Sequence, residues 1–337
     1  MNASHEGGCV SETDITVAAV IGAGMMGPGI ALTLALGGMR VTIVDLTLRD
    51  ATAGLEKARA QAHVLVTHEL AEPAQAERAL NLLGASADLD VTVAHADLVI
   101  ESIPENMTLK QELFARLDAL VPTCAVLASN TSGLSITAIA SRCAHPERIL
   151  TAHFWNPPYL MPLVEIVRGE KTSADIAESV RRLLIRCGKT PVIVKKDRPG
   201  QLGNRLQEAL VREAAYIVEE GIATAEDVDL AAKSGFGMRL PVYGILEHQD
   251  IVGLDLGLAV VEYVGKDLYS EHDAPRYYRD MVARGDLGAK TGKGFYDWSV
   301  KNADEVRARR DEFLLELLKS RRRKARGLSQ VGDATGR

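Results

Sequence analysis

The sequence lacks the features that mark several classes of protein. No stretch approaches the roughly 18 uninterrupted apolar residues of a membrane-spanning helix, and the four cysteines are scattered, with no C-x-x-C pair and no metal-ligand spacing. The first residues lack the basic and apolar regions of a secretion signal, so we expect residues 1–14 to form a short flexible tail. No internal repeat or low-complexity block is present. These absences favour a cytoplasmic protein that crosses no membrane, binds no metal and depends on no disulfide framework.

The composition is that of an ordinary soluble globular protein. The 337 residues carry a formal net charge of −6, with 47% hydrophobic and 25% charged residues, and the length suffices for two domains that each bury a core. An acidic chain is a poor general binder of nucleic acid, because neutralising phosphates requires clustered positive charge. The basic cluster in residues 321–337 could contact an acidic partner or RNA through salt-sensitive binding, but we favour a solvated, disordered tail.

The first half of the sequence alternates short apolar runs with helical patterns. Strand-length runs rich in β-branched residues are separated by helix-like segments, among them Gly27–Leu36 and Leu109–Leu120. Near-continuous apolar strands that alternate with helices indicate a parallel sheet covered on both faces. We therefore predict an α/β fold with an N-terminal Rossmann-like doubly wound sheet. The expected strands are 16–22, 40–45, 96–102, 125–130, 148–154, 163–167 and 190–195.

The second half of the sequence has mostly helical patterns. Residues 206–221 carry apolar residues at helical spacing and end at a glycine, as helices commonly do. Pro199 and Gly200 interrupt the pattern before this helix, so we place the domain boundary there. The predicted organisation is a flexible tail (1–14), the Rossmann-like domain (15–197), a smaller all-helical domain (198–300), an amphipathic helix (301–320) and a basic tail (321–337).

A glycine-rich turn follows the first expected strand. Gly22, Gly24 and Gly27 lie directly after that strand and at the start of a helix, with Met25 and Met26 between the second and third glycine. The first glycine permits a tight turn, the second lets the backbone approach a pyrophosphate, and the third allows close packing of helix on strand. The helix N-terminus adds N–H donors and positive potential for the anion. This context predicts a dinucleotide site.

The second expected strand ends in an acidic residue that selects between the two nicotinamide dinucleotides. Asp45 lies 18 residues beyond Gly27 and can accept hydrogen bonds from both ribose hydroxyls at the adenosine end. Its charge would repel a 2′-phosphate, so NAD is favoured over NADP. Arg49 in the same loop could instead hold the extra phosphate. We predict NAD as the cofactor.

Several further motifs together resemble one family. SNTSGLSIT (129–137), HFWNPPYLMPLVEIV (153–167) and PGQLGNRL (199–206) occur in order and are followed by KTGKGFYDW (290–298). This set resembles the 3-hydroxyacyl-CoA dehydrogenase family, over about residues 17–298. The resemblance implies an NAD-dependent oxidoreductase acting on a CH–OH group, with a helical second domain that forms a homodimer contact. The enzymes that act on acyl-CoA belong to fatty acid metabolism.

The resemblance also implies roles for particular residues. His153 matches the family's catalytic histidine, and Glu165, twelve residues on, matches the glutamate that pairs with it. An imidazole suits the work of taking a hydroxyl proton, because its ordinary pKa of about 6.5 lies near working pH. A neighbouring carboxylate fixes the ring tautomer and stabilises the imidazolium. Taken alone, however, a histidine in an aromatic run such as HFW is more often a core residue.

Other polar residues match the family's substrate and cofactor contacts. The resemblance gives Ser132 and Asn204 to the substrate and the catalytic site, Asn156 to the substrate, and Glu105 and Lys110 to the cleft that holds cofactor and substrate. Each also has a simpler role. Ser132 could cap the next helix, Asn204 could be a structural hydrogen-bonding residue, and Lys110 could be an exposed charge on a helix.

The sequence departs from the acyl-CoA enzymes in two places. Residues 46–80 have four basic and five acidic residues, whereas the acyl-CoA enzymes place a lysine-bearing helical pair there against coenzyme A. Residues 235–247 resemble the branch of L-gulonate 3-dehydrogenase and λ-crystallin, and residues 153–172 resemble a branch acting on a pyridine carboxylate in vitamin B6 breakdown. We therefore favour a small hydroxy acid as substrate, with an acyl-CoA as the alternative. Arg239 could anchor the carboxylate, or could simply be an exposed arginine.

Two other classes of function remain open. A non-catalytic, crystallin-like protein that binds NAD would not need the pairing of His153 with Glu165. A reductase of imines or phosphosugars on a similar scaffold is disfavoured by the H-F-W-N motif and the glutamate after it.

Overall fold

The computed structural model describes residues 15–334, with side chains as far as Lys324. The predicted N-terminal tail, 1–14, lies outside the described residues. The described chain divides into two compact units, one formed by residues up to Asn204 together with those from Arg310 onward, and one formed by Arg205–Arg309. The predicted fold class, a Rossmann-like sheet followed by a smaller helical part, is confirmed.

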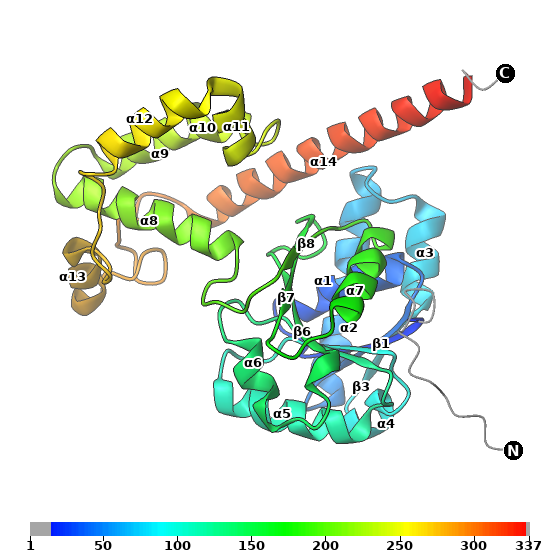
Figure 1. The fold of residues 1–337 in the computed structure, drawn as a ribbon. Coiled ribbons are helices and arrows are strands. Elements are labelled where there is room, and N and C mark those ends of the chain that lie inside the picture. The colour runs from blue at the N-terminus through cyan, green and yellow to red at the C-terminus, as the bar shows by residue number, and fades with distance from the viewer. Residues whose placement is uncertain (1–14, 335–337) are drawn as a thin grey trace, which may run out of the picture. The chain divides into compact units, whose positions relative to one another are not determined.

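The first unit is built on one eight-stranded sheet (Figure 1). Its strand order is β3-β2-β1-β4-β5-β6-β7-β8, and all neighbours run parallel except β6 and β7, which are antiparallel. Neighbouring parallel strands are joined by helices, as a parallel sheet requires. The strands are β1 (Val17–Ile21), β2 (Arg40–Val44), β3 (Leu83–Ser86), β4 (Leu98–Glu101), β5 (Val126–Ser129), β6 (Ile149–Phe154), β7 (Leu163–Arg168) and β8 (Thr190–Val194).

Helices cover both faces of this sheet. The helices of the first unit are α1 (Gly27–Leu36), α2 (Leu48–Thr67), α3 (Pro73–Asn81), α4 (Leu89–Val93), α5 (Met107–Leu120), α6 (Ile136–Ile139) and α7 (Ala174–Arg186). Alternate strand residues such as Val20 and Ile166 pack with α1 and α7, and the intervening residues, such as Ile21 and Leu127, pack with α5 and α6. Because both faces are buried, the strands have nearly continuous apolar sequences.

One face of the sheet becomes polar where the central strands end. Glu101 and Ser129 are the last residues of β4 and β5, and His153 lies near the end of β6. By the alternation of side chains along a strand, these residues share the face of Val99, Leu127 and Ile149, which is the face covered by α5 and α6. Carboxyl ends of parallel strands form the usual ligand-binding edge of an α/β sheet.

The second unit is helical in its described residues. It contains most of α8 (Gly203–Glu219), then α9 (Ala225–Ser234), α10 (Phe236–Arg239), α11 (Ile245–Val252), α12 (Leu254–Val264) and α13 (Arg276–Arg284), and the start of α14 (Ala303–Ala334). A cluster of rings includes Tyr277 and Tyr278 against Phe295, and the Tyr296 hydroxyl contacts Asp229 at 2.8 Å. The unit divides from the first after Asn204 rather than at the predicted boundary of 197/198, because residues 201–204 bond to the first unit.

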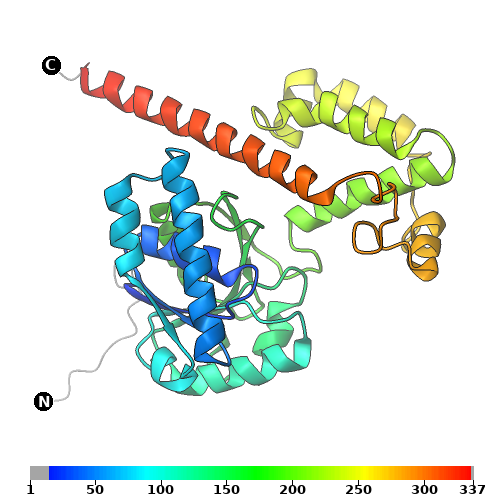
Figure 2. The same cartoon turned by 180° about the vertical axis from the view of Figure 1, so that it is seen from behind.

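The C-terminal helix corrects one prediction. We expected a helix over 301–320 and a disordered tail over 321–337, but α14 continues to Ala334 (Figure 2). Leu315 is buried against Leu32, Ala58 and Leu65, which belong to α1 and α2.

Ion pairs continue this contact beyond the buried leucine. Lys319 and Arg323 bind Glu69 at 3.3 and 3.4 Å, and Arg322 binds Glu72 at 3.0 Å. Both acids lie at the turn between α2 and α3. Two of the basic residues that suggested a solvated tail, Arg322 and Arg323, therefore form ion pairs within the chain, with acids about 250 positions earlier.

Candidate active site

The glycine turn has the shape that its sequence predicts. Gly22 has φ +102°, and a Cβ there would lie 2.6 Å from the Ser102 carbonyl oxygen. A Cβ on Gly27 would lie 1.8 Å from the Gly22 carbonyl oxygen, so both positions exclude any side chain. Around Gly24, by contrast, a Cβ would meet nothing within 4 Å. The fold thus requires the first and third glycines, whereas the second leaves open space above the backbone, as close approach of a pyrophosphate requires.

The start of α1 and the end of β2 complete the adenosine end of this site. Met26 caps α1 without any side-chain hydrogen bond, which leaves N–H groups of the first turn available to an anion. Met25 is 75% exposed beside it. The Asp45 carboxylate accepts from the Ala23 and Leu46 N–H groups, both at 2.7 Å. These bonds hold it against the glycine turn with lone pairs left for ribose hydroxyls, so these residues fit a bound NAD.

His153 and Glu165 are brought together by the antiparallel pairing of β6 and β7. They are directly opposite residues in that register, which places both side chains on one face. His153 Nδ1 lies 2.8 Å from Glu165 Oε2, and both side chains are buried. With Nδ1 engaged by the carboxylate, the neutral tautomer keeps Nε2 as a proton acceptor. The twelve residues from His153 to Glu165 thus span the end of β6, the loop after it and the start of β7.

The Glu165 carboxylate is fully buried and accepts four hydrogen bonds. Oε1 accepts from the N–H groups of Leu202 and Gly203 at 2.9 and 2.8 Å, and Oε2 accepts from His153 and from the indole N–H of Trp155 at 2.9 Å. Burial alone would raise the pKa of this carboxyl group, but the four donors outweigh it and lower the pKa to about 2. Glu165 is therefore a charged acceptor beside the imidazole.

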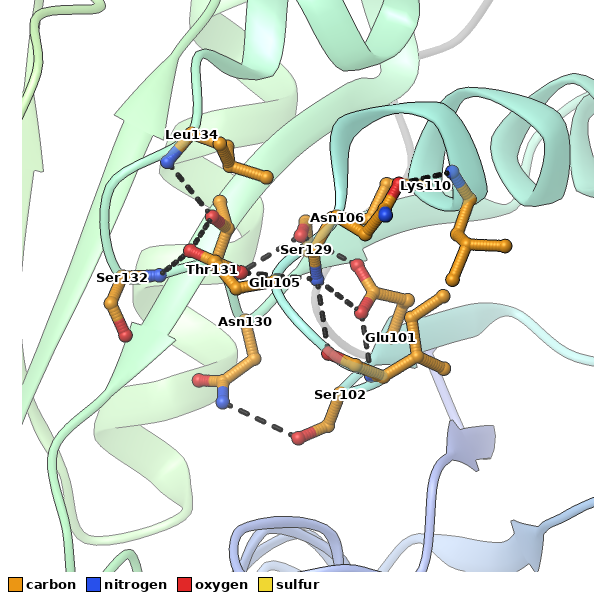
Figure 3. Close-up of polar contacts among 12 residues, drawn as sticks. Glu101, Ser102, Glu105, Asn106, Lys110, Ser129, Asn130, Thr131, Ser132 and Leu134 are labelled. Atoms are coloured by element: carbon orange, nitrogen blue, oxygen red, sulfur yellow. Dashed lines mark hydrogen bonds and ion pairs between the residues drawn. The ribbon is translucent and has the colours of Figure 1, made fainter.

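A second buried network lies at the ends of β4 and β5 (Figure 3). Glu101 is fully buried and accepts from Lys110 Nζ at 2.5 Å, from the Ile103 N–H at 2.7 Å and from Ser129 Oγ at 2.6 Å. Lys110 also lies 3.5 Å from Glu105. Because Lys110 is only 1% exposed, it is not the solvated helix charge considered above. It holds Glu105 from inside the protein.

Glu105 organises the turn that contains Ser132. Its Oε1 accepts from Thr131 Oγ1 at 2.5 Å and from the N–H groups of Ser132 and Gly133 at 2.9 and 3.2 Å. Partial burial would raise the pKa of Glu105, but the Thr131 hydroxyl, Lys110 and the two N–H groups lower it. Figure 3 shows the exposed Ser132 hydroxyl pointing away from this network. The cap of the next helix is Ser135, not Ser132, so the side chain of Ser132 is left for another use.

The segment before α8 closes onto the same turn. Asn204 Nδ2 donates to the Ser132 carbonyl oxygen at 2.9 Å, and Gln201 Nε2 donates to the Thr131 carbonyl oxygen at 2.8 Å. Asn204 therefore has a structural contact, and its predicted role toward the substrate stays a prediction.

The remaining predicted residues have less defined surroundings. Asn156 is exposed directly after Trp155, in the loop between β6 and β7. Arg239 is exposed at the end of α10, in the second unit. Their roles toward a substrate also stay predictions.

Three residues of the site were not predicted from the sequence. Glu101 resembled the end of an ordinary strand, although a buried acid in an apolar run signals a partner. Trp155 was noted only as part of the H-F-W-N motif. Gln201 is 4% exposed, has φ +54°, and its Oε1 lacks a hydrogen-bond partner among the described residues. Its unusual backbone lies directly before the two N–H groups that Glu165 accepts.

Within residues 15–334, no helix is long and apolar enough to cross a bilayer. The same residues contain no group of three or more His, Cys, Asp or Glu side chains placed to hold a metal ion.

The fold and this site define a class of protein, the dinucleotide-dependent dehydrogenases. Comparison with known families agrees. Residues 17–198 match the NAD-binding domain of 3-hydroxyacyl-CoA dehydrogenase, and residues 200–298 match its C-terminal domain. The chain belongs to the 3-hydroxyacyl-CoA dehydrogenase family, as its motifs had suggested, and it is an NAD-dependent oxidoreductase of the kind that acts on CH–OH groups.

Its relatives act on different kinds of substrate. The chain is 34% identical to 5-formyl-3-hydroxy-2-methylpyridine 4-carboxylate 5-dehydrogenase of Mesorhizobium japonicum, over 87% of this chain and 94% of that protein. A crystal structure of such an enzyme, described as an NAD+-dependent dismutase, matches with a TM-score of 0.83 and 32% identity, covering 90% of this chain and 97% of that one.

Two further relatives differ in how much of the chain they match. L-carnitine dehydrogenase of Streptomyces coelicolor is 35% identical over 97% of both chains. A probable 3-hydroxybutyryl-CoA dehydrogenase of Bacillus subtilis is 39% identical over 84% of this chain and 98% of that protein.

Proposed function

We propose that this protein oxidises the secondary alcohol of a small, free hydroxy acid or related carboxylate, with His153 as general base and Glu165 as its partner. The observation that carries the general base is the 2.8 Å contact between His153 Nδ1 and a buried, charged carboxylate. This contact orients the ring and leaves Nε2 as the proton acceptor. Bound NAD supplies the hydride acceptor.

The proposed step balances one hydride and one proton. The C–H bond of the carbinol carbon breaks as a hydride leaves, the O–H proton passes to Nε2 of His153, and a carbonyl forms. The imidazolium so produced is stabilised by Glu165, which stays ionised because its pKa is about 2. Ser132 and Asn156 are proposed to donate hydrogen bonds to the substrate oxygen, and Asn204 to hold the substrate beside them. Arg239 is proposed to pair with the carboxylate.

Two observations favour a free substrate over a CoA thioester. L-carnitine dehydrogenase matches this chain over 97% of its length, whereas the probable 3-hydroxybutyryl-CoA dehydrogenase matches 84%. The longer match leaves only about 3% of this chain uncovered, so it includes most of α14, which lies largely in the last tenth of the chain. In this structure the middle of α14, from Leu315 to Arg323, packs on α1 and α2 and on the turn between α2 and α3. Helices α2 and α3 form the helical pair against which the acyl-CoA enzymes of the family, by the resemblance, place coenzyme A.

A substrate panel tests the proposal. Purified enzyme and NAD are incubated with L-carnitine, other free hydroxy acids, pyridine carboxylates bearing a hydroxymethyl or formyl group, and 3-hydroxybutyryl-CoA, with NADH absorbance as the signal. We expect turnover of a free acid and little of the thioester. Efficient turnover of the thioester alone would instead assign the protein to the acyl-CoA enzymes. NADH binding with no turnover of any compound would favour the crystallin-like alternative.

We also propose that the second unit forms a homodimer in the cytoplasm. Its helices expose many large apolar side chains, which is costly in a monomer and typical of an interface. On α12 these include Leu254, Leu256, Leu258, Val260, Val261 and Tyr263, which are 52% to 80% exposed. Sedimentation velocity should give a dimer, and Leu258→Asp should give a monomer. A monomeric unaltered protein would refute this part of the proposal.

A further inference from the structure

Trp155 makes an unusual contact with the carboxylate of the proposed base pair. Its indole N–H donates to Glu165 Oε2, the same oxygen that faces His153 Nδ1, at distances of 2.9 and 2.8 Å. The Trp155 and His153 rings lie side by side, with centroids 5.9 Å apart. One carboxylate oxygen therefore accepts hydrogen bonds from two rings, and the strength of its bond to His153 depends on the bond to Trp155.

Gly203 is the residue that leaves room for the indole. A Cβ at position 203 would lie 2.5 Å from Trp155 Cζ2, which is closer than side chains can approach. The Gly203 N–H itself donates to the other oxygen of Glu165. Gly203 therefore contributes in two ways. Its N–H binds the Glu165 carboxylate, and its lack of a Cβ leaves space for the Trp155 indole.

We propose that Trp155 is a positioning residue that shares Glu165 Oε2 with His153, and that Gly203 and Trp155 form a complementary pair in which the small residue admits the large one. The inference rests on the proposed function only for its catalytic meaning. The geometry itself can be tested without any substrate.

The shared oxygen should make His153 a weaker base than it would be without Trp155. A carboxylate oxygen that accepts two hydrogen bonds offers less negative charge to each donor than an oxygen that accepts one. Trp155 therefore weakens the stabilisation that Glu165 gives to the imidazolium of His153. Removing the indole N–H should strengthen that stabilisation and raise the pKa of His153.

His153 is the titratable side chain with a direct contact to Glu165 among the described residues. On β8, which pairs with β7, the residue opposite Glu165 is Val192. The segment after β8 meets the carboxylate through backbone N–H groups. Asp197 in that segment is bound by Ser135 and by the Thr137 N–H. On β4, Glu101 is paired with Lys110.

The first experiment is an NMR titration of the histidine. In protein labelled with ¹⁵N-histidine, the His153 signals are assigned by their loss in His153→Gln and followed against pH. We expect Trp155→Phe to raise the pKa of His153 by about half a unit to one unit, from the loss of one charge-assisted hydrogen bond. The matched control is Trp298→Phe, which changes the only other tryptophan. An unchanged His153 titration in folded Trp155→Phe would overturn the positioning role.

The second experiment is a double-mutant cycle in thermal stability. Gly203→Ala should lower the melting temperature by about 2–6 °C, because the methyl group overpacks against the indole. It should also shift one of the two indole N–H signals. In a Trp155→Phe background the same change should be neutral or slightly stabilising, since alanine favours the helix that begins there. An equal cost in both backgrounds would show that the two residues are not a pair.

Discussion

Replacing Glu165 by glutamine changes one atom of the site and should affect stability and catalysis together. The carboxylate is fully buried and accepts four hydrogen bonds. A glutamine presents one oxygen and one NH₂ group, so two of the four donors would face another donor. Leaving buried donors unsatisfied is costly. The donors that would lose their acceptor are either the two backbone N–H groups of Leu202 and Gly203 or the rings of His153 and Trp155.

The size of the stability loss follows from the pKa. The pKa of Glu165 falls from an ordinary 4.5 to about 2 in the folded protein. At about 1.4 kcal/mol per pKa unit, the ionised carboxylate contributes about 3 kcal/mol to folding at neutral pH. Since the folded value lies below the unfolded one, this contribution is complete above about pH 4.5 and is lost as the pH falls toward 2. Glu165→Gln should therefore be less stable than the unaltered protein by about this amount above pH 4.5, and the difference should shrink as the pH falls toward 2.

The catalytic loss follows from the tautomer. If the NH₂ group of glutamine faces His153, Nδ1 must become the acceptor and the proton moves to Nε2, where the substrate proton should go. The same change of tautomer in a catalytic triad costs roughly 10⁴ in kcat. We therefore expect kcat/KM to fall by about 10³ to 10⁴ while NADH binding stays near its original value.

The assays are urea unfolding at several pH values and NADH formation with the substrate found in the panel. Glu178→Gln is the matched control. That glutamate is partly exposed, its pKa is also lowered, chiefly by Arg181, and it has no contact with the site. If Glu165→Gln kept kcat/KM within tenfold and unfolded at the same urea concentration as the unaltered protein, the role given to this carboxylate would be wrong.

Three further changes test the rest of the site. Gly24→Ala should fold normally and weaken NADH binding about tenfold or more, as measured by fluorescence titration. Gly27→Ala should fail to fold, as measured by circular dichroism, because its methyl group would lie 1.8 Å from a backbone oxygen. Asp45→Ala should weaken binding of NADH more than that of NADPH, and an equal effect on both would argue against a contact with the ribose. Lys110→Met should cost about 3–5 kcal/mol in urea unfolding by leaving Glu101 buried without its cation, and adding Glu101→Gln should restore part of the loss.

The parts of this protein that follow a local pattern could be predicted from the sequence. Strand β1 (VAAVI) is apolar throughout and β2 (RVTIV) is mostly apolar, because both faces of the sheet are covered. The pairing of His153 with Glu165 was expected from the resemblance to the family, and the structure places the two residues opposite each other and in contact. The turn around Gly22 could be predicted from its glycines, because its backbone conformation leaves no room for side chains there.

Other parts depend on contacts between distant segments and could not be predicted locally. Strand β3, with the sequence LGAS, has too few β-branched or aromatic residues to be distinguished from a loop, and it forms by pairing with β2. Residues 319–324 of α14 (KSRRRK) are rich in charge and include no apolar residue, and the acids that bind them lie between α2 and α3. No window of sequence near residue 320 contains that information.

The chemistry of the site is distinguished by which cation accompanies each buried carboxylate. In the described part of the chain three carboxylates are buried, those of Glu101, Asp118 and Glu165. Glu101 pairs with Lys110, and Asp118 pairs with Arg148 at 2.7 Å, so each of these acids lies beside a buried lysine or arginine. Glu165 pairs with a histidine, the residue type that most often serves as a general acid or base. Four hydrogen bonds keep Glu165 ionised whether His153 is neutral or protonated. Under the proposed function, a proton taken up by His153 would meet a negative charge that was present before it arrived, and this arrangement suits the proposed alcohol oxidation.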